Sequence, residues 1–430
     1  TIASNTDPPR PNEGIFFKSA LDRRGVGLLT GEGVLLSDGA DHTRKRRLIV
    51  PSFDGKSLTS FVDTMESVAL EFATKQETYG QMINIPQFTS AIAMKIVGLC
   101  LFSTNVVDDS AIYQDISNCL EHVIYVSRHP FSLPQWVPTR RNRNYKKSLK
   151  KLDNLVYSMM ESGKERLKEG PDNKNRQQDL LEMLLAARYV DEDDVHGDNN
   201  NKNSKLSDKE LRDEIMTLFL AGHETTAIAL SWTLWFLSDP AHMEWQDLIA
   251  AEYANVQTNG GFTPQSLQDT DTMKYTRAVL CEALRLRPPS YAVDREVQQD
   301  VVAPGSVLLK RNDIVLLAPI AMHMNPMYFD QPQTFDPTRF LEEKATQKNV
   351  DPWDGLFDRS VYLPFGAGRK RCIGYKFAQW EMLIILSTLL NHIRVTRSPS
   401  NGSGSKDLCW DAGVTWRPDP LLELKIEARK

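Results

Sequence analysis

The sequence predicts a mainly helical protein with small β-sheets, and three observations lead to this prediction. Many segments carry apolar residues at spacings of three and four, which is typical of amphipathic helices. Pieces rich in β-branched residues are short and come late in the chain. The 430 residues are 41% hydrophobic, which is enough for a large buried core. Length alone allows two or three domains, but one large domain also fits.

The longest predicted helix lies in the middle of the chain. Ser207 and Glu210 form a capping-box pattern before a long apolar run, so we expect a helix from there to about Asp239–Pro240. Its part Ile215–Leu237 is long enough to cross a bilayer. However, polar residues 223–226 lie at its centre, where a charge is costly in lipid. A helix through the interior of the protein, with a polar functional centre, fits better.

The remaining elements follow from the same patterns. Predicted helices cover roughly 55–76, 88–102, 108–127, 143–168, 177–188, 240–257, 272–286 and 375–391. Predicted strands are Val297–Val302, Val307–Leu309, Asp313–Leu317 and Leu421–Ile426. Two polar segments, 191–205 and 398–405, are predicted loops. No internal repeat of fixed period is present in the sequence.

Composition excludes several classes of protein. The net charge of −5 argues against a basic nucleic-acid binder, so no nucleic-acid partner is expected. The five cysteines are odd in number, widely spread and never arranged as CxxC. A disulfide scaffold and a zinc finger are therefore not indicated.

The most distinctive local pattern is FGAGRKRCIG, at residues 365–374. A dinucleotide-binding loop needs a third glycine where Arg371 stands, and a phosphate-binding P-loop needs GK followed by Ser or Thr; both patterns fail. What remains is a glycine-rich turn, three cations and Cys372, just before an apolar helix. The helix dipole and the cations are expected to stabilise a thiolate there. From this chemistry alone, a metal-binding or nucleophilic sulfur and an inert core cysteine remain equally open.

The segment resembles the haem-binding loop of the cytochrome P450 superfamily, with Phe, Gly, a cation, the axial Cys and a following Gly at this spacing. Further segments resemble that family's other motifs in the right order: His42–Arg46, Ala221–Thr226, the ExxR sequence Glu282–Arg285, and Phe335–Phe340. The agreement spans residues 42 to 374. The chain is therefore identified as a member of this superfamily, with a P450-like fold around a buried haem.

The resemblance implies the roles of residues around the cofactor, haem b (iron protoporphyrin IX). Cys372 would be the metal ligand, and its thiolate would favour cleavage of the O–O bond. Phe365 would pack beside the sulfur, and Gly366 and Gly374 would let the loop approach the porphyrin closely. The expected contacts of the haem propionates are His42, Arg46, Arg295 and Lys370. Lys370 departs from the family, which usually has Arg or His there, and lacks the bidentate fork of Arg.

In the central helix, Ala221 and Gly222 present almost no side chain, which suits a large flat group lying against them. Glu224 and Thr225 would supply an acid and a hydroxyl that relay protons to reduced dioxygen. Thr226 is expected only to bond back to the preceding helical turn. A zinc-protease HExxH motif fails because Ala227 stands where the second His is required.

Glu282 and Arg285 lie three residues apart, so they share one helix face and could form a buried ion pair. Such a pair is uninformative alone, because surface helices contain many of them. In the ordered motif set, it is expected to be extended by Arg339. We assign these three residues a structural role in holding the haem loop.

The resulting prediction is a haem-thiolate monooxygenase that inserts one atom of dioxygen into a lipophilic organic substrate. The alternatives are a peroxide-using or rearranging haem-thiolate enzyme, and a non-enzymatic haem-binding sensor. Electrons are expected from a separate donor, either a P450 reductase or a ferredoxin. Arg369, Lys370, Arg371 and Lys376 would form its positive docking face.

We expect residues 1–430 to form a single P450-like domain. The resemblance also implies that its N-terminal helix, first strands and any membrane anchor are missing. Membrane association through such an N-terminus would place the enzyme at the endoplasmic reticulum, and without an anchor it would be cytoplasmic.

Overall fold

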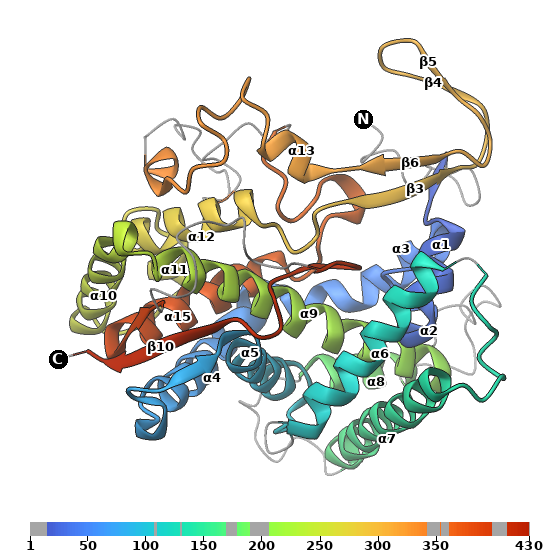
Figure 1. Cartoon of the computed structure of the whole chain (residues 1–430). Helices are drawn as coiled ribbons and strands as arrows, with labels where there is room; N and C mark the ends of the chain where they lie inside the picture. The colour runs from blue at the N-terminus through green and yellow to red at the C-terminus, as the bar shows by residue number, and fades with distance from the viewer. Residues whose placement is uncertain are drawn as a thin grey trace.

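The computed structural model describes residues 15–106, 110–129, 131–168, 179–189, 206–341, 353, 361–397 and 411–429. The predicted loops at 191–205 and 398–405 lie outside these residues. The predicted class is confirmed, because the described chain is mainly helical with small antiparallel sheets (Figure 1). The α-helices are α1 (Ala20–Gly25), α2 (Gly27–Thr30), α3 (Gly39–Ile49), α4 (Gly55–Ala73), α5 (Ile85–Phe102), α6 (Ser110–Arg128), α7 (Arg140–Lys168), α8 (Leu180–Tyr189), α9 (Asp208–Leu237), α10 (Met243–Thr258), α11 (Pro264–Gln268), α12 (Lys274–Leu286), α13 (Pro319–His323) and α15 (Tyr375–His392). The strands are β1 (Phe16–Phe17), β2 (Met82–Asn84), β3 (Val293–Val297), β4 (Val301–Ala303), β5 (Val307–Leu309), β6 (Ile314–Leu317), β7 (Ile393–Thr396), β8 (Asp411–Ala412), β9 (Trp416–Arg417) and β10 (Glu423–Ala428).

The predicted helices all appear, with shifted ends. Helix α5 begins three residues before its predicted start, because Asn84 caps it and Pro86 is accommodated in its first turn. The predicted strand Val297–Val302 is wrong: β3 ends at Val297, and β4 begins only at Val301. Strands β1, β2, β8 and β9 have only two or three residues each, too few for an alternating pattern to be recognised.

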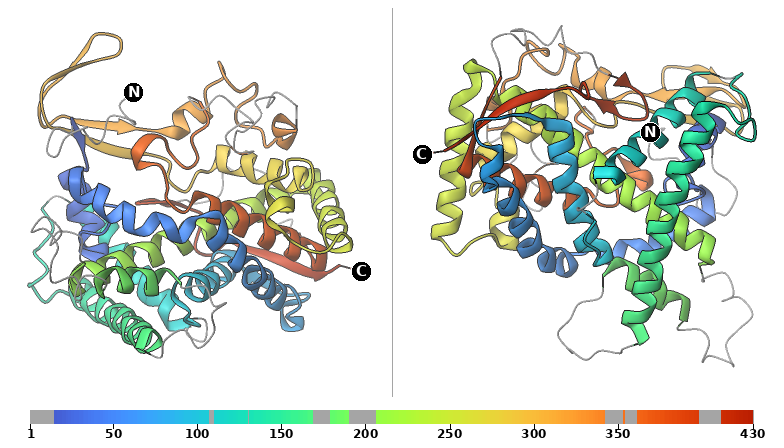
Figure 2. Two further views of the ribbon diagram at one scale, coloured as in Figure 1. Left: turned by 180° about the vertical axis from the view of Figure 1, so that it is seen from behind. Right: turned by 60° about the horizontal axis from the view of Figure 1, so that its bottom comes forward.

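Helix α9 runs through the centre of the molecule (Figure 1). The predicted capping box is present: the Ser207 N–H donates to Glu210 at 2.8 Å, and the Glu210 N–H donates to the Ser207 hydroxyl at 3.2 Å. The helix packs against α5 on one side and α12 and α15 on the other; the view from behind in Figure 2 brings α15 to the front. It is the longest described helix, with 30 residues, and most of its side chains are buried, as the sequence predicts.

Among the described helices, one is long and apolar enough to cross a membrane by length and composition. This helix is α5. The central stretch Ile215–Leu237, the longest apolar run of the sequence, does not meet the same test. In α5, 72% of the apolar window is buried inside the protein, largely against α4 and α9. A core helix passes the same test, so this is weak evidence for a membrane span.

The strands form four small antiparallel sheets, and one of them joins distant parts of the chain. Strand β10 lies between β2 and β7, with Leu424 opposite Ile83 and Ile426 opposite Val395. These side chains face the core: Leu424, Ile426 and Val395 are all at most 1% exposed. The sheet β1-β3-β6 covers the opposite side of the molecule, and the β4–β5 hairpin projects from it (Figures 1 and 2).

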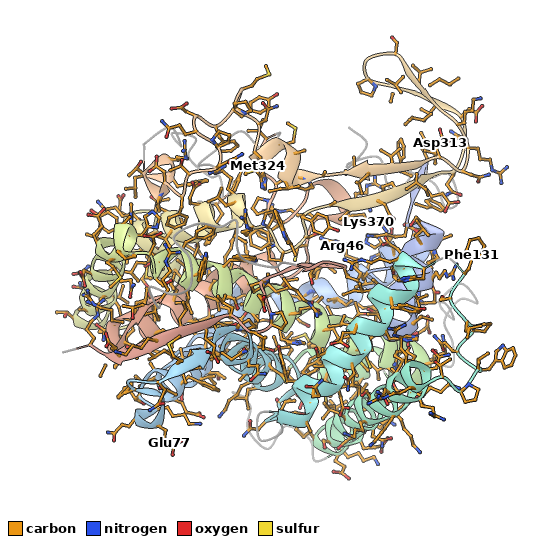
Figure 3. The ribbon with its side chains drawn as sticks, in the orientation of Figure 1. Arg46, Glu77, Phe131, Asp313, Met324 and Lys370 are labelled. Carbon is orange, nitrogen blue, oxygen red and sulfur yellow. The ribbon has the colours of Figure 1, made fainter. Side chains whose placement is uncertain are left out.

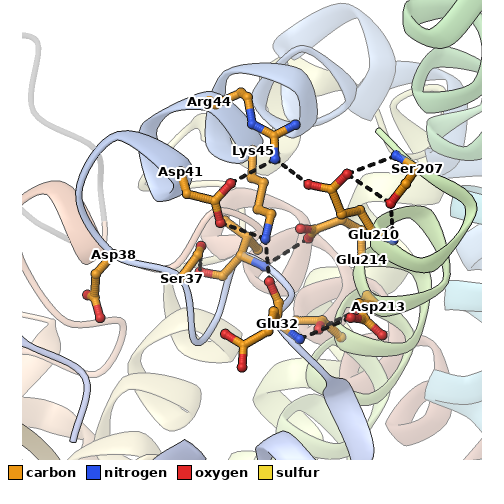
Figure 4. Close-up of polar contacts among 12 residues, drawn as sticks. Glu32, Ser37, Asp38, Asp41, Arg44, Lys45, Ser207, Glu210, Asp213 and Glu214 are labelled. Carbon is orange, nitrogen blue, oxygen red and sulfur yellow. Dashed lines mark hydrogen bonds and ion pairs between the residues drawn. The ribbon is translucent and has the colours of Figure 1, made fainter. Parts of the chain in front are cut away.

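The turn between α2 and α3 is fastened to the first turns of α9 (Figure 4). The Glu32 N–H donates to the Asp213 carboxylate at 3.1 Å, and the Val34 N–H donates to the buried Glu214 carboxylate at 2.9 Å. Arg44 of α3 forms an ion pair with Glu210. These contacts fix α3, the helix that carries the predicted cofactor contacts His42 and Arg46, relative to α9.

Candidate active site

The loop before α15 turns tightly and presents Cys372. Gly366 and Gly368 have φ values of +71° and +70°, the left-handed region that glycine adopts at no steric cost. The Cys372 N–H donates to the Phe365 carbonyl at 3.0 Å, which closes the loop. Gly374 is the N-cap of α15, so Cys372 lies just before the helix, as predicted from the sequence.

The Cys372 side chain is exposed, yet surrounding protein atoms desolvate its thiol. Burial raises the pKa of the thiol, while the Gly374 N–H and the guanidiniums of Arg46 and Arg371 lower it. The net pKa is above the ordinary value. The predicted stabilisation of the thiolate by the helix N-terminus and the cations is therefore present, but burial outweighs it. A coordinated metal ion would lower the pKa of the thiol further.

The predicted ion pair on α12 is fully buried. Arg285 and Glu282 are each 0% exposed and form a bidentate pair, with N–O distances of 2.6 and 2.8 Å. Arg339 approaches Glu282 at 3.4 Å, and the Asp336 N–H donates to the same carboxylate at 2.9 Å. Arg285 also donates to backbone carbonyls, among them those of His323 (2.8 Å) and Pro332 (2.7 Å). This geometry suits the structural role that we infer for Glu282, Arg285 and Arg339.

His323 connects this ion pair to the segment before the cysteine loop. Its carbonyl accepts from Arg285, and its ring Nε2 accepts the Leu363 N–H at 2.9 Å. Burial lowers the pKa of His323 to about 4, while Arg285 acts in both directions, because its hydrogen bond raises the pKa and its charge lowers it. A neutral ring is required for Nε2 to act as an acceptor, so burial and hydrogen bonding agree.

Ala221 and Gly222 of α9, the two small residues predicted to lie against the cofactor, face different neighbours. Ala221 is exposed although Leu220 and His223 beside it are buried, so the helix has an open face at this point. A Cβ on Gly222 would lie 3.2 Å from the Val97 side chain, tighter than ordinary contact. Gly222 therefore permits the close approach of α5 and α9, while Ala221 lies on the open side.

Glu224 is held by a segment from the other end of the chain. The Thr415 hydroxyl donates to Glu224 Oε1 at 2.7 Å, and Arg417 donates to the same oxygen from Nε (2.9 Å) and Nη2 (2.6 Å). Burial raises the pKa of Glu224, but the Arg417 charge and these hydrogen bonds outweigh it, so the net pKa lies below the ordinary value.

The two threonines after Glu224 differ from the prediction. Thr225 bonds back to the Ala221 carbonyl at 2.7 Å, on the open side of the helix. Thr226 does not simply bond back, and that expectation is wrong: its hydroxyl donates to Glu381 of α15 at 2.9 Å. Glu381 is fully buried, and burial raises its pKa well above the usual range, so it is a neutral acid in the core.

The four cations predicted to contact the cofactor do not all point to an open site. His42 and Arg46 lie one turn apart on α3, and Arg46 donates to the Arg371 carbonyl at 2.9 Å. Figure 3 shows Arg46 and Lys370 in the interior, below β3 and β6. Lys370 donates to Asp38 (3.0 Å) and to the Ser37 carbonyl (2.6 Å), and its side chain is only 6% exposed. Arg295 is also buried and donates to the Asp294 carbonyl.

Because Lys370 points inward, its assignment to a positive docking face is wrong. Arg369 and Lys376 are exposed, and Arg371 is partly buried with its guanidinium over the Tyr375 ring. The outward charge near the loop is therefore smaller than the sequence suggests.

Sequence reasoning missed several residues of the site. Thr415 and Arg417 lie in a C-terminal stretch without any recognised motif. Lys18 is another: burial and the charges of Arg295 and Lys370 lower its pKa to about 8, which places a third cation beside those two. Lys18 follows the two-residue strand β1, and no sequence motif around it indicates a binding site.

A cavity of about 380 Å³ opens beside this region. Its lining is mostly apolar and includes Val26, Leu36, Ile124, Tyr291, Val293 and Val414. Residues 290–293, which follow the end of α12, also line this cavity. Among the described residues, no group of three or more His, Cys, Asp and Glu side chains could hold a metal ion.

Comparison with known proteins agrees with this arrangement. The family model described as cytochrome P450 matches residues 12–422. Cyclooctatin synthase of Streptomyces melanosporofaciens is 31% identical over 92% of this chain and 77% of its own length. Cyclooctat-9-en-7-ol 5-monooxygenase of the same organism is 29% identical over 90% and 78%. Human cytochrome P450 4X1 is 26% identical over 93% and 75%.

Proposed function

The chain belongs to the cytochrome P450 family and is a haem-thiolate monooxygenase, and from this premise we propose how its own residues serve the reaction. The observation that carries the proposal is the position of Cys372: an exposed side chain, on a glycine-shaped loop at the start of α15, close to the cationic residues Arg46 and Arg371.

The residues around this sulfur fit haem b. The exposed Ala221, beside the buried Leu220, offers an open face of α9 for a flat group, and Cys372 would bind its iron. When bound, the haem would activate dioxygen with two electrons and two protons, so that one oxygen atom enters the substrate and the other leaves as water. The loop around Phe365, Gly366 and Gly374 would bring the protein backbone close to it.

Buried cations would balance the negative charge of the haem propionates. His42 and Arg46 on α3 and Arg295 on β3 are the proposed partners. Lys370 would act from beside Asp38, to which it is bound, and Lys18 adds a further positive side chain near Arg295. A carboxylate bound among these side chains would be stabilised by their charges and by charge-assisted hydrogen bonds.

Protons would reach the site through the acid and the alcohol of α9. Glu224 would take up a proton from solvent and pass it to the Thr225 hydroxyl, which in turn donates its own proton toward the reacting oxygen. Thr225 Oγ1 already donates to the Ala221 carbonyl on the open side of the helix, so its lone pairs can accept. Neither Glu282 nor Arg285 would take part, because both are fully buried and paired.

The substrate is proposed to be a lipophilic organic molecule. The mostly apolar lining of the 380 Å³ cavity supports this, because such pockets bind ligands mainly through apolar contact. The name of the relative that is a cyclooctat-9-en-7-ol 5-monooxygenase further favours a largely hydrocarbon, cyclic substrate.

The electrons are proposed to come from a separate protein, either a P450 reductase or a ferredoxin. Arg369 and Lys376 are exposed near the cysteine loop and could contact an acidic partner.

The first test is the absorption spectrum of the reduced protein under carbon monoxide, recorded for the parent and for Cys372→Ala. A strongly red-shifted Soret band is expected in the parent only, because that band requires a thiolate opposite carbon monoxide. Haem bound to the parent without this band would contradict an intact thiolate ligand. Product analysis with cyclic hydrocarbons and a surrogate electron donor then tests the substrate class.

A further inference from the structure

A short C-terminal hairpin, β8 and β9 with the turn between them (residues 411–417), contacts two functional regions at once. On one side, Thr415 and Arg417 bind Glu224. On the other, Gly413 and Val414 line the 380 Å³ cavity. One stretch of five residues therefore separates the acid of α9 from the space that a substrate would enter.

The contact with Glu224 is one-sided. Three hydrogen bonds reach Oε1, from Thr415 Oγ1 at 2.7 Å and from Arg417 Nε and Nη2 at 2.9 and 2.6 Å. Within the described part of the chain, no donor reaches Oε2. One oxygen is thus fixed and the other is left available, which is the arrangement that a carboxylate needs to accept and release a proton without losing its orientation.

Other titratable groups around Glu224 do not replace Arg417. His223, its neighbour on α9, is buried with a lowered pKa and is therefore neutral near pH 7. Tyr113 of α6 faces both Glu224 and Arg417, and burial raises its pKa, so it too is uncharged. Arg417 is accordingly the charge that governs this carboxylate among the described residues.

The hairpin is also tied to the cavity wall. The Trp416 N–H donates to the Pro289 carbonyl at 2.9 Å, and the Tyr291 hydroxyl donates to the Gly413 carbonyl at 3.1 Å. Tyr291 itself lines the cavity. A Cβ on Gly413 would lie 2.5 Å from Ile124 of α6, so the turn has no room on that side. A molecule that presses on Val414 would therefore displace the strand that carries Arg417, since the packed turn cannot yield elsewhere.

We propose that Arg417 and Thr415 are positioning residues for the Glu224 carboxylate, and that the hairpin transmits occupancy of the cavity to this ion pair. The proposal rests on the function proposed above and deepens it. With the cavity empty, Arg417 holds Glu224 in place. When the cavity is filled, the hairpin moves, the ion pair loosens, and Glu224 binds a proton more readily. The acid returns to the carboxylate once the proton has passed to Thr225.

The test is a titration of Glu224 itself, by infrared difference spectra between each protein and its Glu224→Gln counterpart. Arg417→Gln is expected to raise the pKa of Glu224 by about 1–3 units, because an opposite charge at this distance lowers a carboxyl pKa by that amount. Arg417→Lys should restore most of the parent value. The matched control is Arg394→Gln, which removes an arginine that pairs with Asp247 instead and should leave Glu224 unchanged. An unshifted pKa in Arg417→Gln would overturn the positioning role.

The second part of the proposal is tested by filling the cavity from within. Val414→Trp is expected to raise the pKa of Glu224, in the same direction as Arg417→Gln. Leu308→Trp enlarges an exposed side chain on β5, which does not line the cavity, and should have no such effect. Equal pKa values in both variants and the parent would overturn the coupling. The carbon monoxide spectrum of each variant reports an intact site, and if Val414→Trp lacks that band, Val414→Phe takes its place.

These readouts do not depend on turnover. If the carboxyl titration fails to shift while the carbon monoxide band is present, the positioning proposal fails and the haem-thiolate assignment stands. If the parent lacks the band, the proposed function fails whatever the titration shows.

Discussion

His323 is the residue through which the buried ion pair of α12 reaches the cysteine loop. Its ring is fully buried, and Nε2 accepts the Leu363 N–H, two residues before Phe365. A protonated ring could not accept this hydrogen bond and would place a charge beside Arg285. The pH at which His323 binds a proton is therefore linked to the stability of the site.

We predict that the protein loses stability as the pH falls from about 6.5 toward 4. The pKa of His323 is lowered from its ordinary value to about 4, so the unfolded chain binds a proton in this window that the folded chain does not. The contribution is of the order of 3 kcal/mol, since one pKa unit corresponds to about 1.4 kcal/mol. The free energy of unfolding from denaturant titrations at several pH values measures it.

His323→Leu should flatten this pH dependence. It also removes the acceptor of the Leu363 N–H, so we expect about 1–3 kcal/mol lower stability at pH 7. A variant with the slope of the parent between pH 6.5 and 4 would show that His323 does not cause it. His129, which is exposed and bonds to a local carbonyl, provides the matched control as His129→Leu.

The residues that the sequence predicts are those whose chemistry is local. Glu282 and Arg285 share a helix face by their spacing alone, and Cys372 precedes a recognisable helix. Thr415 and Arg417 act on a residue about 190 positions earlier, and the chain between carries no pattern that encodes the contact. Lys370 illustrates the same limit: its charge is visible in the sequence, but its partner Asp38 is supplied by tertiary packing.

Among the secondary structure elements, helices were predictable and short strands were not. Ten or more residues give several helical turns, so the apolar stripe of α7 or α12 is recognisable. A two-residue strand such as β1 exists because a distant segment, β3, pairs with it, and its sequence has no period of its own. The residues of the candidate site lie on long helices as well as on short strands, so the sequence predicts only some of them.

A further prediction concerns the turn between α2 and α3, which lies in close contact with α9. Gly31 has a φ of +63°, and a Cβ there would lie 2.2 Å from the Asp213 carboxylate on α9. Gly31→Ala should therefore destabilise the protein by more than the roughly 1–2 kcal/mol of the left-handed backbone alone. The free energy of unfolding measures the loss.

Gly39, at the start of α3, is the matched control. Its φ of +56° is similar, but nothing lies within 4 Å of a Cβ at that position. Gly39→Ala should therefore lower the free energy of unfolding only by the cost of the left-handed backbone. Equal losses in the two variants would mean that the turn can move away from α9 without a loss of stability.

At the scale of the whole molecule, one hydrophobic core extends from Leu29 to Ile426. The single domain stays a prediction, which the next variant tests. Leu424 on β10 belongs to this core, is 0% exposed and lies opposite Ile83 of β2, so it joins two segments far apart in the sequence.

Leu424→Ala is expected to lower the stability of the entire protein by about 2–5 kcal/mol, the usual cost of a cavity at a buried leucine. Circular dichroism and tryptophan fluorescence should still report one coincident unfolding transition. Two separate transitions would instead show that the β2-β10-β7 sheet is an independent unit, and would contradict the single domain.

The place of β10 in its sheet also has a consequence for biosynthesis. Strand β2 is translated about 340 residues before the strand that pairs with it, β10. The loop that carries Cys372 and the hairpin that binds Glu224 also come after α4, α5 and α9 in the chain. The nascent chain therefore holds α4 and α5 beside an unpaired strand edge until β10 has been made. Chains interrupted before β10 would keep this edge open to pairing with other chains.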